Sequence, residues 1–173
     1  LPRGRTYANT GRAHEIKING NVVTAKVSGS RPSPYKVTIT FQEFDLDTKE
    51  NLREIINNSP LILSGLLNKK LPLQIIKTLE QVKIKLFPSS WLEIDASCNC
   101  PDWAMPCKHI ASVIYLLCAQ IDQNPFTLFE VHNCDLPNLI ADYRDGHANN
   151  IQKITNIEEI FEVSKETTSQ QRI

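Results

Sequence analysis

The sequence predicts an α+β fold: a small antiparallel β-meander, then a helical middle, then a segment built around a cluster of cysteines. Three observations support it. Apolar and polar residues alternate through residues 15–41, apolar residues recur at helical spacing from about residue 47, and three cysteines and a histidine fall within residues 98–109.

The meander is predicted from three strand-like runs. Glu15–Ile18 and Asn21–Val27 alternate on either side of Asn19-Gly20, a two-residue hairpin signal. The loop Ser28–Pro34 then leads to Tyr35–Phe41, the clearest strand of the chain. Side chains of a strand alternate between its two faces, so the polar face receives three lysines, with an arginine in the adjoining loop. These residues are Lys17, Lys26, Lys36 and Arg31.

The middle of the chain carries residues that mark the starts of helices. Asp47 with Glu50 predicts a capped helix start, and prolines near the starts of two further apolar stretches predict two more helices. Ile84–Phe87 and Trp91–Ala96 are expected to be extended.

The four metal-type side chains follow the pattern Cys-x-Cys, a six-residue spacer, then Cys-x-His. Three thiols and one imidazole form a tetrahedral zinc set, and four protein ligands leave no open position for catalysis. The expected ligands of Zn²⁺ are Cys98, Cys100, Cys107 and His109.

A strongly apolar helix is expected from Cys107 to about Gln120, in the core. The spacer residues Trp103 and Met105 are expected to roof the metal, although Trp103 is also suited to stacking on a nucleobase. Lys108 is expected to point away from the metal and either to offset the thiolate charge or to contact a phosphate.

Other interpretations of the cysteines fit less well. The alternatives to a metal set are buried free thiols or two disulfides. A disulfide between cysteines one residue apart is strained, which disfavours two bridges, and a second ligand pair with a histidine is unexpected among free thiols. Cys118 lies about 16 Å along the helix from Cys107, too far to share the ion, and is expected to be a core thiol. His132 and Cys134 repeat the one-residue spacing without a second pair nearby, so a second metal there is disfavoured.

These residues resemble the SWIM zinc finger, and the chain from about Arg5 to about Leu139 is similar to bacterial SWIM proteins associated with Swi/Snf-type helicase-like ATPases. Softer matches flank the finger: Arg5-Thr-Tyr-Ala8 with Gly11, Gly29–Tyr35, Leu86-Phe-Pro88 and Asn124–Phe129. Such proteins usually have more chain before the first stretch, and residues beyond about 140 have no recognised counterpart.

The resemblance implies a ββα-like finger with its helix in the core. It also implies an interaction module that contacts DNA, a Swi/Snf-type ATPase, or both. The alternative is a purely protein–protein adaptor with a structural zinc and no affinity for nucleic acid. No catalytic motif is found, so we expect no enzyme and no small-molecule substrate. The candidate nucleic-acid set is Lys17, Lys26, Arg31, Lys36 and Lys108.

Composition separates two parts of different charge. The net charge is zero, but residues 1–36 hold seven basic residues and one acidic residue, which favours a polyanion partner for that part. Zero net charge favours the adaptor, since DNA-binding domains are usually basic.

An odd cysteine count with a metal-type set indicates a reducing compartment, and no apolar run is long enough to span a bilayer. We expect a bacterial cytoplasmic location, where association with the nucleoid is one option. Because Leu1 is not an initiator methionine, we expect the chain to be part of a longer protein.

The predicted segments follow one another along the chain, with 1–140 expected to form one domain. They are a meander at 1–45, a helical segment at 46–90, the finger at 91–123, a docking segment at 124–140 and a polar tail or linker at 141–173.

Overall fold

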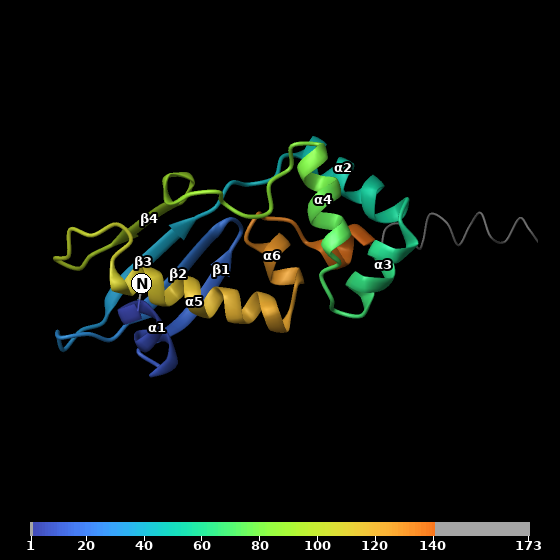
Figure 1. Ribbon diagram of the computed structural model, residues 1–173. Helices are drawn as coiled ribbons and strands as arrows, with labels where there is room; N and C mark the ends of the chain where they lie inside the picture. Colours follow the sequence, from blue (N-terminus) through green and yellow to red (C-terminus); the bar gives the residue numbers. More distant parts are fainter. Residues whose placement is uncertain (1, 141–173) are drawn as a thin grey trace, which may run out of the picture. The chain divides into compact units, whose positions relative to one another are not determined.

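The computed structural model describes residues 2–140 (Figure 1), and the predicted tail at 141–173 lies outside these residues. The residues up to Leu139 form one compact unit, whose fold is set out below. It is a mixed α+β fold with a four-stranded antiparallel sheet and several helices, as the sequence predicts.

The sheet has the strand order β1-β2-β3-β4, with every neighbouring pair antiparallel. The first three strands are the predicted meander: β1 (Ala13–Asn19), β2 (Val22–Val27) and β3 (Tyr35–Thr40). The hairpin turn is Gly20-Asn21, one residue later than expected, because Asn19 still pairs with Val22. The fourth strand, β4 (Asp95–Cys98), comes from far along the chain and pairs with β3.

A bulge in β1 sets which side chains share a face. His14 pairs with Lys26 and Lys17 with Thr24, so β1 contains one more residue between these two pairs than β2 does. Glu15 is the extra residue and adopts a φ of 52°. The bulge places Ala13 and Ile16 both on the core side, which uninterrupted alternation would not allow.

One face of the sheet is covered by α5 (Lys108–Gln123), on which α1 (Pro2–Asn9) packs (Figure 1). Ile110, Val113 and Leu117 of α5 are buried in the core with the inward side chains of the strands. The sequence does not predict α1, because this segment has no apolar stripe. It lies so close to α5 that a Cβ on Gly4 would stand 2.6 Å from the Cβ of Ala111.

The predicted helical middle is confirmed as α2 (Leu46–Asn57), α3 (Pro60–Leu67) and α4 (Leu73–Gln81). The cap of α2 is Asp45, not Asp47: an Asp45 carboxylate oxygen accepts from the Thr48 N–H at 2.8 Å. Ile84–Phe87 forms no strand, and a short 3₁₀ turn, Trp91–Glu93, precedes β4.

A last short helix, α6 (Phe126–Glu130), follows α5 and buries Phe129 completely. The next residues tie distant segments together. His132 is buried, and its ring nitrogens lie 2.6 Å from the Gln42 carbonyl oxygen and 3.2 Å from that of Leu86. Its ring also stacks on Phe44 with a centroid separation of 4.3 Å.

Candidate metal centre

The four predicted ligands come together where β4 ends and α5 begins. Cys98 is the last residue of β4 and Cys100 follows two residues on. Asn99, between them, is anchored to β3 in both directions: its amide N–H donates to the Lys36 carbonyl at 3.3 Å, and its side-chain oxygen accepts from the Lys36 N–H at 2.9 Å. The first ligand pair is therefore held as an extension of the sheet.

The second ligand pair belongs to the start of α5. Cys107 is the N-cap of the helix, and its Sγ accepts from the Ile110 N–H at 3.5 Å. His109 lies in the first turn, and both residues are buried. A spacer that loops out between the strand and the helix lets two rigid elements present one pair each.

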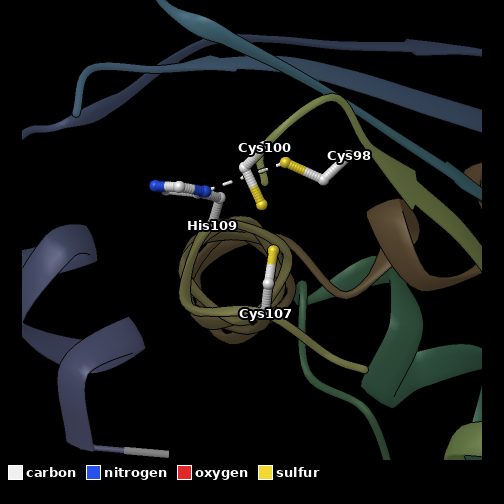
Figure 2. A group of neighbouring side chains, drawn as sticks. All are labelled: Cys98, Cys100, Cys107 and His109. Atoms are coloured by element: carbon white, nitrogen blue, oxygen red, sulfur yellow. Dashed lines mark hydrogen bonds between the residues drawn. The ribbon is translucent and has the colours of Figure 1, made fainter. Parts of the chain in front are cut away.

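The ligand atoms converge on a single point. One atom from each of Cys98, Cys100, Cys107 and His109 lies within 4.8 Å of all the others. Figure 2 shows the three sulfurs directed toward one another, with one nitrogen of the imidazole toward Cys98. That nitrogen is Nδ1, at 3.8 Å from the Cys98 Sγ. Tetrahedral bonds of about 2.3 Å to sulfur imply ligand separations of about 3.8 Å, so the cluster could hold a metal ion after a small contraction.

The surroundings of the cluster favour the uncharged form of its thiols. Burial, followed by the neighbouring thiols, raises the pKa of Cys98 to about 12, and burial also raises the pKa of Cys107. Burial, reinforced by the nearby charge of Lys108, lowers the pKa of His109, with Asp102 opposing. Three thiols close together are thus unfavourable as thiolates on their own, whereas a divalent ion would stabilise the deprotonated form.

Two tyrosines hold the imidazole of His109. Tyr35 of β3 stacks on it with a centroid separation of 4.3 Å, and Tyr7 of α1 meets it edge-on at 5.5 Å. Each tyrosine carries a guanidinium on its ring, Arg31 at 5.1 Å from the Tyr35 centroid and Arg12 at 4.7 Å from the Tyr7 centroid. The ligand is therefore positioned by residues from two segments remote from it in sequence.

Two predictions about the surroundings of the cluster are wrong. Trp103 does not roof the metal position: it is 100% exposed, and Met105 is 66% exposed, because the spacer loops away from the protein. Cys118 is not a core thiol but an exposed one, since it lies about 100° around the helix from the buried Leu117.

The pair His132 and Cys134 does not form a second centre. Both ring nitrogens of His132 face carbonyl oxygens, which leaves neither for a metal. Within residues 2–140, the cluster at β4 and α5 is the one group of at least three metal-type side chains close enough to share an ion.

The predicted nucleic-acid set is divided between two sides of the sheet. Lys17, Lys26 and Lys36 are exposed on the face opposite α5, and Lys26 pairs directly with Lys36 across the strands. Lys26 also forms an ion pair of 2.7 Å with Glu15, which the bulge brings to this face. We call the face that carries these lysines the outer sheet face.

Arg31 and Lys108 do not belong to the outer sheet face. Arg31 covers the ring of Tyr35, and Tyr35 points to the opposite side of β3 from its neighbour Lys36. The polar face therefore carries the three lysines without Arg31. Lys108 is 3.7 Å from a carboxylate oxygen of Asp102, beside the metal cluster.

Comparisons with known proteins add little about function. No family model and no solved structure match the chain. The sequence is similar to Uncharacterized protein Rv2102 of Mycobacterium tuberculosis, at 32% identity over 152 residues, which is 86% of this chain and 55% of that relative. The chain thus spans about half the length of the curated relative it matches. No helix in the described residues is both long and apolar enough to cross a membrane.

Proposed function

We propose that this chain is a zinc-binding interaction module of the SWIM type, in which the metal is structural. Three thiolates and an imidazole are ligands that zinc prefers, and a set of four protein ligands closes the coordination shell. The convergence of these four atoms from β4 and α5 is the observation that carries the proposal. The proposed finger at 91–123 holds β4 and α5, whose helix is part of the core, and the strand that pairs with β4 is β3, from earlier in the chain.

In this proposal the module binds and does not catalyse. It serves a Swi/Snf-type helicase-like ATPase in the bacterial cytoplasm, and its own contact with DNA is made by the outer sheet face. Lysines on three neighbouring strands suit phosphate oxygens, while few groups there can distinguish base edges. Two rows across the strands carry the lysines of the outer sheet face: His14, Lys26 and Lys36, then Lys17, Thr24, Thr38 and Ser97. The same face also carries Glu15 and, in the next row, Asn19, Thr40 and Asp95.

The distribution of charge supports DNA over the adaptor alternative. At the finger end of the sheet, the exposed basic residues Arg12, Lys26, Arg31 and Lys36 outnumber the exposed acidic ones, Glu15 and Asp102. At the opposite end the chain carries Asp95 and, just beyond β3, acidic residues at 43, 45 and 47. A polyanion approaching the protein would therefore be oriented toward the finger.

One observation favours the adaptor. The spacer loop presents Trp103 and Met105 to solvent, and exposed aromatic and methionine side chains are typical of protein interfaces. In that alternative the zinc finger holds this loop in place for a protein partner, and the lysines of the outer sheet face are exposed to solvent without a binding role.

Binding of a duplex to the zinc-loaded protein across a range of salt concentrations tests the proposal. Three lysines that contact phosphate predict a slope of log affinity against log salt of about −3. The double change Lys26→Glu with Lys36→Glu should abolish binding. Glu15→Gln should strengthen it, because Lys26 loses its carboxylate partner.

The matched control is Lys70→Glu with Lys77→Glu, the same change of charge at exposed positions outside the sheet. If both double variants weaken binding equally, only net charge matters and the outer sheet face is not the contact. If the parent fails to bind at low salt, the adaptor replaces the DNA proposal.

A further inference from the structure

The spacer between the two ligand pairs, residues 101–106, carries the most exposed large apolar side chain of the described residues. Trp103 is 100% exposed and Met105 is 66% exposed, so neither side chain contributes to the core. In Figure 1 the spacer projects beyond the end of the sheet, between β4 and the start of α5. A connection between two ligand pairs needs only sufficient length, so the fold does not account for a tryptophan at this position.

Trp103 lies in a turn that is held at several points. One carboxylate oxygen of Asp102 accepts a hydrogen bond from the Ala104 N–H at 3.2 Å, which closes the turn around Trp103. The other carboxylate oxygen lies 3.7 Å from the Lys108 ammonium and so ties the turn to the first residue of α5. The indole is therefore presented from a preorganised turn, and little backbone freedom is lost when it meets a partner.

A row of basic side chains on the outer sheet face leads to this loop. His14, Lys26 and Lys36 lie opposite one another across β1, β2 and β3. The row ends at Asn99, whose backbone and side chain are both bonded to the backbone of Lys36 just before the spacer begins. Since neighbouring strands are about 4.8 Å apart, Lys26 and Lys36 stand about two and one strand spacings from Asn99. A chain of phosphates that follows these lysines across the strands is thus brought to the loop that carries Trp103.

The small apolar area at this end of the sheet disfavours a protein partner. Among the described residues, the other exposed large apolar side chains all lie between residues 46 and 91. An aromatic side chain buries about 250 Å² at most, and a standard protein interface buries about 800 Å² on each partner. Trp103 and Met105 together fall well short of that area, whereas a single indole is sufficient to stack on one base.

The charges at this end favour a polyanion. The exposed basic residues include Arg12, Arg31, Lys26 and Lys36. The acidic side chains there are already in ion pairs: Glu15 is 2.7 Å from the Lys26 ammonium, and Asp102 is paired with Lys108. A basic track beside an aromatic platform is the combination found in proteins that bind single strands of nucleic acid.

We propose that Trp103 stacks on an unpaired base of a single-stranded nucleic acid whose phosphates contact Lys26 and Lys36. The inference rests on the proposed function, because it uses the same lysines, and it names the form of nucleic acid that the module prefers. Bases within a duplex expose only their edges in the grooves, so an indole on a projecting loop finds a free base face only where a strand is unpaired. Stacking of this kind tolerates any base, so little sequence preference is expected.

The test is a titration of the zinc-loaded protein with a single-stranded oligothymidylate, read by tryptophan fluorescence. The chain contains two tryptophans, so Trp91→Phe leaves Trp103 as the sole reporter. Saturable quenching by the oligothymidylate is expected. An abasic oligonucleotide of the same length carries the same phosphates without bases, and it should not quench.

Two substitutions at residue 103 measure the contribution of the ring. Trp103→Ala should weaken oligothymidylate binding about tenfold, the effect of losing one stacked base, and should leave the zinc content unchanged because the side chain is fully exposed. Trp103→Phe should retain most of the affinity. Trp91→Phe is the matched control, a change to the other exposed tryptophan, and should bind as the parent does.

A duplex closed by a hairpin at each end has no unpaired terminal base, and Trp103→Ala should bind it as the parent does. Equal affinity of Trp103→Ala and the parent for the oligothymidylate would overturn this proposal, as would equal quenching by the abasic strand. If the closed duplex still binds in that case, the proposed contact of the outer sheet face stands alone. If neither form of nucleic acid binds at low salt, both proposals fail.

Discussion

Replacement of Cys107 by serine and by alanine separates two roles that this residue combines. Its sulfur is one of the four converging ligand atoms, and the same sulfur caps α5 by accepting from the Ile110 N–H at 3.5 Å. Serine is a good N-cap and nearly the same size, but its hydroxyl is a poor zinc ligand. Alanine provides neither the ligand nor the cap.

The magnitudes follow from these contacts. A structural zinc contributes on the order of 10 kcal/mol to folding, comparable with the entire net stability of a domain. Loss of one of four ligands should therefore remove most of the net stability in both variants and lower their solubility, while α5 still forms in the fraction that is folded. An N-cap is worth about 1 kcal/mol, so the Cys107→Ser protein should exceed the Cys107→Ala protein in free energy of unfolding by about that amount.

Metal analysis and urea unfolding, each with and without a chelator, measure the two effects. The parent should hold about one zinc per chain, and chelator should unfold it. Cys118→Ser is the matched control, because it changes an exposed thiol on the same helix and should keep the zinc. A parent that stays well folded without metal, or a Cys107→Ser protein that retains zinc against the chelator as the parent does, would refute the reasoning.

Two further predictions concern the ligands themselves. Gly29→Ala should lower zinc affinity and leave α2–α4 intact, because the added Cβ would stand 2.5 Å from Cε2 of Tyr35 and displace that ring from His109. Competition with a zinc indicator measures the affinity. An unchanged affinity would show that the Tyr35 stack does not position His109. Apparent zinc affinity should rise with pH, since the raised pKa values of Cys98 and Cys107 keep these thiols protonated in the metal-free protein. The rise should continue past the ordinary thiol pKa of about 8.5, toward the pKa of about 12 for Cys98. A plateau of the affinity below pH 8.5 would contradict this prediction.

Much of the candidate site could be predicted from the sequence because it depends on local spacing. Two ligand pairs, each one residue apart, need no long-range information to be recognised, and the helix after His109 is predicted from its apolar periodicity. The same holds for the first three strands and for α3, whose start is marked by Ser59 and Pro60. These features arise from interactions between residues close together in the chain.

Other features of the molecule required the tertiary structure. The sequence could not indicate that Tyr7 and Tyr35 enclose His109, or that β4 would pair with β3, because these contacts join segments far apart in the chain. The bulge at Glu15, which brings its carboxylate to Lys26, has a positive φ without a glycine, so the sequence carries no signal for it.

The helix α1 shows the same limit most clearly. Its residues have weak helical amphipathicity, and the segment is helical where Gly4 permits close approach to Ala111. The local pattern indicated the candidate ligands and most of the secondary structure, since propensity and periodicity are properties of neighbouring residues. Only packing decided what surrounds the ligands, because a contact between distant segments depends on the shape of both surfaces once the chain has folded.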